Sequence, residues 1–343
     1  MRSEQWQTLK KCAQMQAPED TPVALIVDSP WIPGHLEIST LDYFTFPEIW
    51  LKANLEIARQ FPQVIFLPGF WVEMGMGAEP SGFGCKVRFF DDKTPNVYPL
   101  IDSLDEVERI APSNPLTDGL MPFILNLYRK LEPKINAAGH QIKVVAARGP
   151  LATASHLVGV TNLLLGVKLD PANTHRLLEL TTKTTVDWLE AQANALQNVE
   201  GVMVLDDIVG FLGPEDFLEF AHPYLSEVFS AFPEALKIFH NDMDTPVSYP
   251  YLHEWPVDIF NFTHLIDVSE ARRHVGERVC LMGNVPPLEV LAEGSPKLVL
   301  ERARQCLQSH AGKAGVILSA GGGISPGTPG ENIRALIQAA QET

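Results

Sequence analysis

The sequence predicts an α/β fold, a single (β/α)₈ barrel domain over residues 1–343, with the barrel proper from about residue 22 and an elaborated N-terminal segment. Three observations support this prediction. The chain has 343 residues, 45% of them hydrophobic, which is enough for one large core. Eight short apolar runs, rich in β-branched residues, show no polar alternation, a pattern typical of parallel strands buried on both faces. Most of the stretches between them are amphipathic, as the helices around a barrel are.

The eight candidate strands define the predicted barrel. They are residues 24–27, 64–67, 143–147, 202–205, 236–239, 258–262, 279–282 and 316–318. No repeat, low-complexity tract or long linker divides the chain, and the one extended irregular region is residues 68–99. One domain is therefore expected.

Several helix starts are marked by a capping residue followed by proline. Proline fits the first helical position because the N–H that it lacks has no partner there. The four pairs are Asp170-Pro171, Gly213-Pro214, Ser295-Pro296 and Thr328-Pro329, the last with Glu331 as the far half of a capping box. Gly276 and Gly294 follow helical patterns and are expected just past the helix ends.

The composition excludes two classes of partner. Asp and Glu number 42 against 26 Lys and Arg, and the net charge of −16 repels nucleic-acid backbones and anionic membrane surfaces. The four cysteines are scattered, and the first 20 residues hold no apolar run of the signal-peptide kind, which predicts a cytoplasmic protein. Residues 149–167 are uncharged over the length of a membrane helix, but Pro150, His156 and Asn162 favour core and loop.

Polar residues follow the candidate strands, at the end where a barrel carries its active site. Since the C-terminal ends of the strands open on one mouth, we expect these side chains to share a cleft. The candidates for substrate binding are Asp28, Trp71, Arg148, Asn284, Ser319 and Gly322. The alternative is that each polar residue only caps its own loop.

Two pairs among these residues suggest chemistry. His240 and Asp242 lie two residues apart just beyond a strand, so both can reach one point, and imidazole with carboxylate suits a metal such as zinc. The alternative is a His–Asp hydrogen bond that closes the loop. Asp206 and Asp207 form a carboxylate pair in which one pKa can rise far enough for acid–base catalysis. They can equally diverge, one toward solvent and one toward a backbone N–H.

Two loops are further candidates for ligand contact. Residues 69–79 combine aromatic residues, methionines and glycines with Glu73 and Glu79, which suits the lid of a ligand pocket, or else a core-packing loop with exposed glutamates. The glycine-rich loop 319–329 can present backbone N–H groups to an anion but lacks the Gly-Lys-Ser/Thr ending of a P-loop. No Gly-x-Ser-x-Gly segment is present, which disfavours acyl transfer through a serine nucleophile.

Five segments carry a resemblance to a known family. They are residues 149–154, Leu205-Asp206-Asp207 followed by 213–224, 281–287, 317–324, and 328–333. From about residue 22 onward the chain resembles the uroporphyrinogen decarboxylase superfamily, which includes zinc-dependent cobamide:thiol methyltransferases. The resemblance implies one (β/α)₈ barrel with its active-site cleft at the C-terminal strand ends, and members are often homodimers.

The departures from the decarboxylase pattern are informative. The resemblance implies that a decarboxylase carries an Arg-Gln-Ala-Gly-Arg segment after the first strand and an aspartate after the next. Here residues 27–34 read VDSPWIPG and residues 66–69 read FLPG. Without the arginines, a substrate with eight carboxylates would keep several charges unpaired. Decarboxylation of uroporphyrinogen is therefore disfavoured.

The methyltransferase branch fits better. The resemblance implies a His-x-Cys pair and a second cysteine in the last loop as zinc ligands, and these positions are His240-x-Asp242 and Gly322 here. A metal site then needs another donor, for which Glu79 or Glu73 is the candidate. Oxygen ligands make the metal a harder Lewis acid, less suited to thiolates, so the methyl acceptor is expected to differ from a simple thiol.

The resemblance thus implies a methyltransferase that moves a methyl group between a cobamide on a corrinoid protein and a small acceptor, assisted by Zn²⁺. His240 and either Asp206 or Asp207 are the expected catalytic residues. Two alternatives stay open. One is the decarboxylase, for which Arg59, Arg88 and Arg148 are the only basic candidates, and the other is a cleft that binds a corrinoid or tetrapyrrole without turnover.

Overall fold

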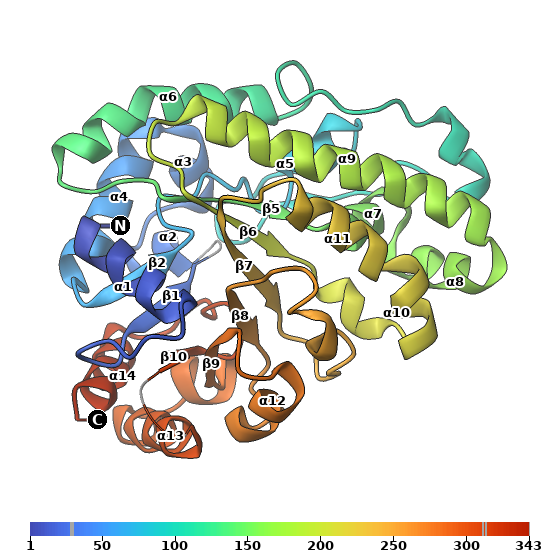
Figure 1. The fold of residues 1–343 in the computed structure, drawn as a ribbon. Coiled ribbons are helices and arrows are strands. Elements are labelled where there is room, and N and C mark those ends of the chain that lie inside the picture. The colour runs from blue at the N-terminus through green and yellow to red at the C-terminus, as the bar shows by residue number, and fades with distance from the viewer. Residues whose placement is uncertain (28–30, 311, 313, 343) are drawn as a thin grey trace.

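The protein is described by a computed structural model that covers residues 1–27, 31–310, 312 and 314–342. Eight parallel strands form one barrel-shaped sheet in the order β2-β1-β10-β9-β8-β7-β6-β5, surrounded by helices (Figure 1). The strands are β1 (Val23–Ile26), β2 (Val64–Leu67), β5 (Val144–Arg148), β6 (Gly201–Leu205), β7 (Leu236–Asn241), β8 (Ile259–Phe262), β9 (Cys280–Val285) and β10 (Val316–Ala320). β2 and β5 end the hydrogen-bonded order, so the barrel is nearly closed. The predicted fold class is confirmed.

Helices occupy most of the chain between the strands. They are α1 (Ser3–Ala13), α2 (Trp31–His35), α3 (Thr40–Thr45), α4 (Pro47–Gln60), α5 (Ala78–Gly82), α6 (Met121–Ala137), α7 (Pro150–Val158), α8 (Val160–Leu169), α9 (Pro171–Ala195), α10 (Pro214–Phe220), α11 (His222–Ser230), α12 (Val268–Val275), α13 (Pro296–Ser309) and α14 (Gly330–Gln341). Shorter turns are η1 (Leu104–Arg109), η2 (Asp207–Phe211), η3 (Tyr249–Tyr251) and the wider η4 (Pro287–Ala292). The irregular region after β2 holds a small hairpin of β3 (Val87–Arg88) and β4 (Asn96–Val97).

Most of the predicted helix boundaries are confirmed. Asp170 and Ser295 accept hydrogen bonds from backbone N–H groups in the first turns of α9 and α13, and Gly276 ends α12 with a φ of +79°. The capping box at Thr328 is wrong. Helix α14 begins one residue later, after Pro329, and the Thr328 hydroxyl donates to the carbonyl of Ser325 instead.

The strands have two apolar faces because each lies between two cores. Alternate residues point into the barrel, among them Ala146, Ile238 and Ile259, and they pack with the buried face of α1. The opposite residues pack against the outer helices. Trp6 of α1 lies against Gly201 at the start of β6, so α1 covers the N-terminal end of the barrel. The N-terminal helix is thus part of the barrel core.

The uncharged stretch 149–167 forms α7 and most of α8. Among the described residues, no single helix is long and apolar enough to cross a membrane. Helices α7 and α8 meet the length and composition of a span only as a pair, and they bend by 105° relative to each other. Most of α7 is buried within the protein.

Candidate functional site

Three strands bring polar side chains into the barrel at their C-terminal ends. Arg148, His240 and Asn261 each lie two residues after an inward-facing residue of β5, β7 or β8, so the period of two turns them inward as well. All three are at most 6% exposed. The deeper layers of the barrel are apolar, so polar chemistry is confined to this end.

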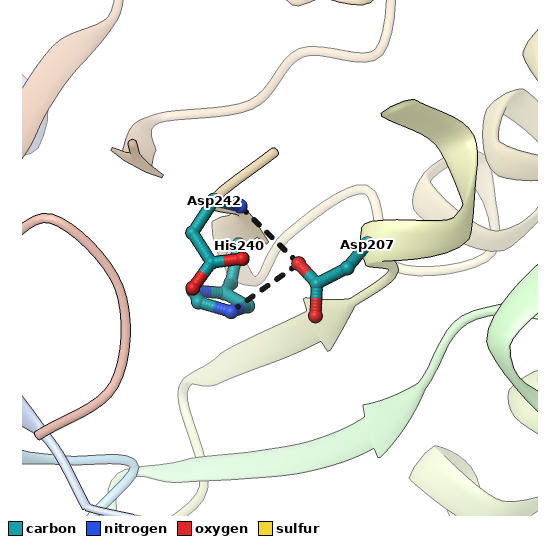
Figure 2. Close-up of side chains that lie close together, drawn as sticks. All are labelled: Asp207, His240 and Asp242. Carbon is teal, nitrogen blue, oxygen red and sulfur yellow. Dashed lines mark hydrogen bonds and ion pairs between the residues drawn. The ribbon is translucent and has the colours of Figure 1, made fainter. Parts of the chain in front are cut away.

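One group at this end has the geometry of a metal site. Asp207, His240 and Asp242 each offer a ligand atom within 4.8 Å of the others. Figure 2 shows the Asp242 carboxylate above the imidazole ring and the Asp207 carboxylate beside it. The Nε2 atom of His240 lies 3.4 Å from Oδ1 of Asp207, which also accepts the backbone N–H of Asp242 at 3.2 Å. The expected convergence of His240 and Asp242 is therefore present, with Asp207 as the third member.

Close contact between two loops produces this arrangement. Gly210 in η2 lies so near the Met243 side chain that a Cβ at this position would overlap it. The Thr245 hydroxyl donates to the carbonyl of Gly210 at 2.7 Å. These contacts bind the loop after β6 to the loop after β7, and so bring Asp207 to Asp242.

The last loop of the barrel reaches the same point. Gly322 has a φ of +132°, and a Cβ built on it would lie 2.5 Å from Oδ2 of Asp242. The Asp242 carboxylate thus occupies the space next to the position at which the resemblance implies a cysteine. The absence of a side chain at position 322 therefore leaves room for the carboxylate of Asp242.

Asn261 contacts the imidazole of His240, and the sequence analysis did not identify this asparagine as a site residue. Its Oδ1 lies 2.7 Å from Nδ1 of His240. The side chain is fully buried inside the barrel. The run 258–262 indicated a core strand, and the only available signal was a lone asparagine in the inward phase of that strand.

Asp206 and Asp207 diverge. Asp206 is fully buried and accepts the N–H groups of Leu151 and Ala152 at the N-terminus of α7, at 2.9 and 3.0 Å. Burial raises its pKa to about 8, although these N–H groups favour the charged form. Asp206 therefore anchors α7, while Asp207 faces His240; an acid–base role for Asp206 stays a prediction.

Glu73, Glu79 and Trp71 gather around Arg148. The Glu79 carboxylate accepts the backbone N–H of Arg148 at 2.8 Å, and Glu73 pairs with its guanidinium at 3.4 Å. The guanidinium lies 5.4 Å from the centre of the Trp71 ring. Burial raises the pKa of Glu79. The metal-capable group among the described residues includes Asp207 and neither glutamate, so Asp207 becomes the candidate for the third ligand.

The other predicted substrate contacts differ in their surroundings. The Asn284 amide donates to the carbonyls of Thr263 and Ile266, so it holds the connection between β8 and α12. Ser319 is buried on β10, and within the described chain its hydroxyl has no hydrogen-bond partner. Asp28 lies outside the described residues.

The donor set fits a divalent cation. One imidazole and two carboxylates are ligands that zinc accepts, and they carry two negative charges that balance a dication. The Asn261 contact on the far ring nitrogen is the outer support that metal-bound histidines commonly have. The residues present therefore fit Zn²⁺, with oxygen where the resemblance implies sulfur.

Comparison with known proteins places the chain in a family and agrees with its fold. The family model described as uroporphyrinogen decarboxylase (URO-D) matches residues 11–343. A uroporphyrinogen decarboxylase of Thermus thermophilus is 28% identical over 270 residues, which cover 76% of this chain and 75% of the relative. A methylated-thiol–coenzyme M methyltransferase of Methanosarcina mazei is 25% identical over 304 residues, covering 86% and 79%.

Solved structures support the fold. A methyltransferase from Methanosarcina mazei superposes with a TM-score of 0.81 over 97% of this chain and 96% of its own, at 19% identity. A B12-independent methionine synthase from a Shewanella species superposes with a TM-score of 0.64 over 94% and 97%, at 11% identity. The relatives include both decarboxylases and a methyltransferase, so enzymes of two kinds share this barrel. Since the family model spans nearly the whole sequence, the chain belongs to the uroporphyrinogen decarboxylase family.

Proposed function

We propose that this chain is a methyltransferase that moves a methyl group between a cobamide on a corrinoid protein and a small acceptor. The observation that carries the proposal is the convergence of Asp207, His240 and Asp242 beside Gly322 at the mouth of the barrel. Two of these positions, with Gly322, are those at which the resemblance to the methyltransferase branch implies zinc ligands. A methyltransferase among the relatives also supports the proposal.

The three side chains would hold Zn²⁺ at the open end of the barrel. When bound, the metal supplies Lewis acidity that lowers the pKa of a coordinated acceptor. The chain contributes orientation: the Asp242 backbone N–H holds Asp207, and Asn261 holds the imidazole. Because two of the ligands are hard oxygens, we expect an acceptor other than a simple thiol, one with an oxygen or nitrogen nucleophile.

The surroundings of the candidate arginines argue against uroporphyrinogen as substrate. Arg148 is buried and paired with Glu73, while Arg59 bonds to Glu56 on the outer surface of α4. Asp207 and Asp242, which follow β6 and β7, are acidic. A substrate with eight carboxylates would meet like charge there, and Arg148 and Arg59 are each already paired with a glutamate.

Metal analysis of the purified protein, combined with a transfer assay, tests the proposal. We expect stoichiometric zinc that is lost in His240→Ala, and consumption of methylcobalamin, seen as a change in its visible spectrum, that depends on the zinc and on an added acceptor. His253→Ala is the matched control, because this histidine lies on the surface at 49% exposure and its imidazole is 4.0 Å from the Glu254 carboxylate.

Two results would contradict the methyltransferase. Metal-free protein that decarboxylates uroporphyrinogen would establish the lyase. Metal-free protein that binds cobalamin tightly and transfers no methyl group to any acceptor of a broad panel would establish binding without turnover.

A further inference from the structure

We propose that Asn261 is a positioning residue that fixes the tautomer of His240, so that Nδ1 carries the hydrogen and Nε2 turns its lone pair toward Asp207 and Asp242. The tautomer follows from the hydrogen bonds alone. The importance of this tautomer for metal binding rests on the proposed function. The two claims can therefore fail separately.

The orientation of the Asn261 amide is determined by main-chain groups. Its Nδ2 atom donates to the carbonyl of Met282 at 2.8 Å and to the carbonyl of Ala320 at 3.1 Å. These carbonyls belong to β9 and β10, so the amide links β8 to the next two strands of the barrel. Rotation of the amide by 180° would place Oδ1 against two carbonyl oxygens, which are acceptors only, and would lose both bonds. Nδ2 must therefore face the strands and Oδ1 must face the ring.

The amide orientation in turn determines the state of the ring. The Oδ1 atom is an acceptor, and it lies 2.7 Å from Nδ1 of His240, so Nδ1 must bear the hydrogen. In the neutral ring the other nitrogen, Nε2, then carries a lone pair in place of a hydrogen. This atom lies 3.4 Å from Oδ1 of Asp207. Three lone-pair donors consequently face one point, an arrangement that favours a cation.

The opposite tautomer would work against metal binding. With hydrogen on Nε2, the ring could donate to Asp207 and satisfy its carboxylate without a cation. Asn261 suppresses this state, because Nδ1 and Oδ1 would then meet as two acceptors in a site with no exposure to water. The neutral asparagine thus favours the tautomer in which Nε2 can bind a metal ion, and it adds no charge to the site.

The experiment reads the tautomer in metal-free protein. In protein labelled with ¹⁵N-histidine, the ring nitrogen shifts of His240 are identified by their disappearance in His240→Ala. At a pH at which the ring is neutral, we expect a hydrogen on Nδ1 and none on Nε2 in the unchanged protein. Asn261→Leu, which keeps a similar volume, should move the hydrogen toward Nε2 and weaken Zn²⁺ binding, measured by chelator competition, by roughly 10–100-fold.

A matched control separates positioning from stability. Asn332 of α14 is also fully buried, and its Nδ2 donates to two main-chain carbonyls, of Leu291 in η4 and of Gly294 just after η4. Asn332→Leu should lower the unfolding temperature to a similar extent and leave the His240 shifts unchanged. If Asn261→Leu folds poorly, the ring nitrogen shifts of the unchanged protein still show whether Nδ1 carries the hydrogen.

The outcomes are distinct. A bare Nδ1 in the unchanged protein, or an Asn261→Leu variant with the original shifts, would overturn the positioning role. Ring nitrogen shifts that show the hydrogen on Nδ1, in a protein that binds no Zn²⁺, would confirm the tautomer and refute the proposed metal site.

Discussion

Gly322→Ala is the sharpest test of the geometry at the barrel mouth. A Cβ at this position lies 2.5 Å from Oδ2 of Asp242, whereas ordinary contact begins at 3.4 Å, so the carboxylate must retreat by about 0.9 Å. Ligand distances in metal sites hold to within about 0.2 Å. We therefore expect Gly322→Ala to remove Asp242 from the ligand set. Loss of a ligand should weaken Zn²⁺ binding by more than the roughly 10–100-fold seen when only its outer support is lost.

The control variant is Gly327→Ala. Gly327 lies in the same loop with a φ of +81°, and no atom lies within 4 Å of its added Cβ. Both variants carry backbone strain of roughly 1–2 kcal/mol, because both put a side chain in the left-handed region. Only Gly322→Ala meets the carboxylate, so the difference between the two isolates that contact.

Zinc affinity by chelator competition and thermal unfolding are measured for both variants. We expect similar losses of unfolding temperature and a loss of affinity in Gly322→Ala alone. Equal affinity in the two variants would refute the inference that Gly322 makes room for Asp242.

Two further predictions concern stability. Arg148→Met removes the guanidinium that pairs with the buried Glu73 carboxylate and should cost about 3–5 kcal/mol in a denaturant titration. Lys134→Met breaks an exposed pair with Glu48 and should cost less than about 1 kcal/mol. Equal small losses would contradict the burial argument. Burial lowers the pKa of His156 from 6.5 to about 4, so its contribution is complete above pH 6.5 and lost as the pH falls through about 4. His156→Gln should therefore remove up to about 3 kcal/mol of the acid-induced fall in unfolding free energy, and an unchanged pH profile would show that the ring is not desolvated.

The strands were predictable because burial on both faces leaves a direct signature. All eight apolar runs became barrel strands, with β7 and β9 extending past their expected ends to include His240 and Asn284. Polar residues at the C-terminal end of a strand interrupt the apolar run, so the pattern ended too early. Asn261 was missed for a different reason: it lies inside a predicted strand, and a single asparagine in the inward phase that begins with Ile259 did not distinguish it from a core residue.

The contents of the site were only partly predictable. The sequence predicted that His240 and Asp242 lie together, because residues two positions apart in an extended chain point the same way. It could not tell Asp206 from Asp207, since the chain leaves β6 at that point and the period of two ends. The choice between Asp207 and the glutamates depends on a contact between distant loops, and on Arg148, which holds Glu73 and Glu79 at β5.

The three side chains that meet in Figure 2 contain no sulfur. Thiolates exposed to peroxide pass to sulfenic and then to sulfinic acids, and a metal ion that depends on them is released. Carboxylate and imidazole do not undergo this sequence of reactions. An ion held by Asp207, His240 and Asp242 should therefore stay in place under aerobic, peroxide-containing conditions that empty a thiolate-based centre.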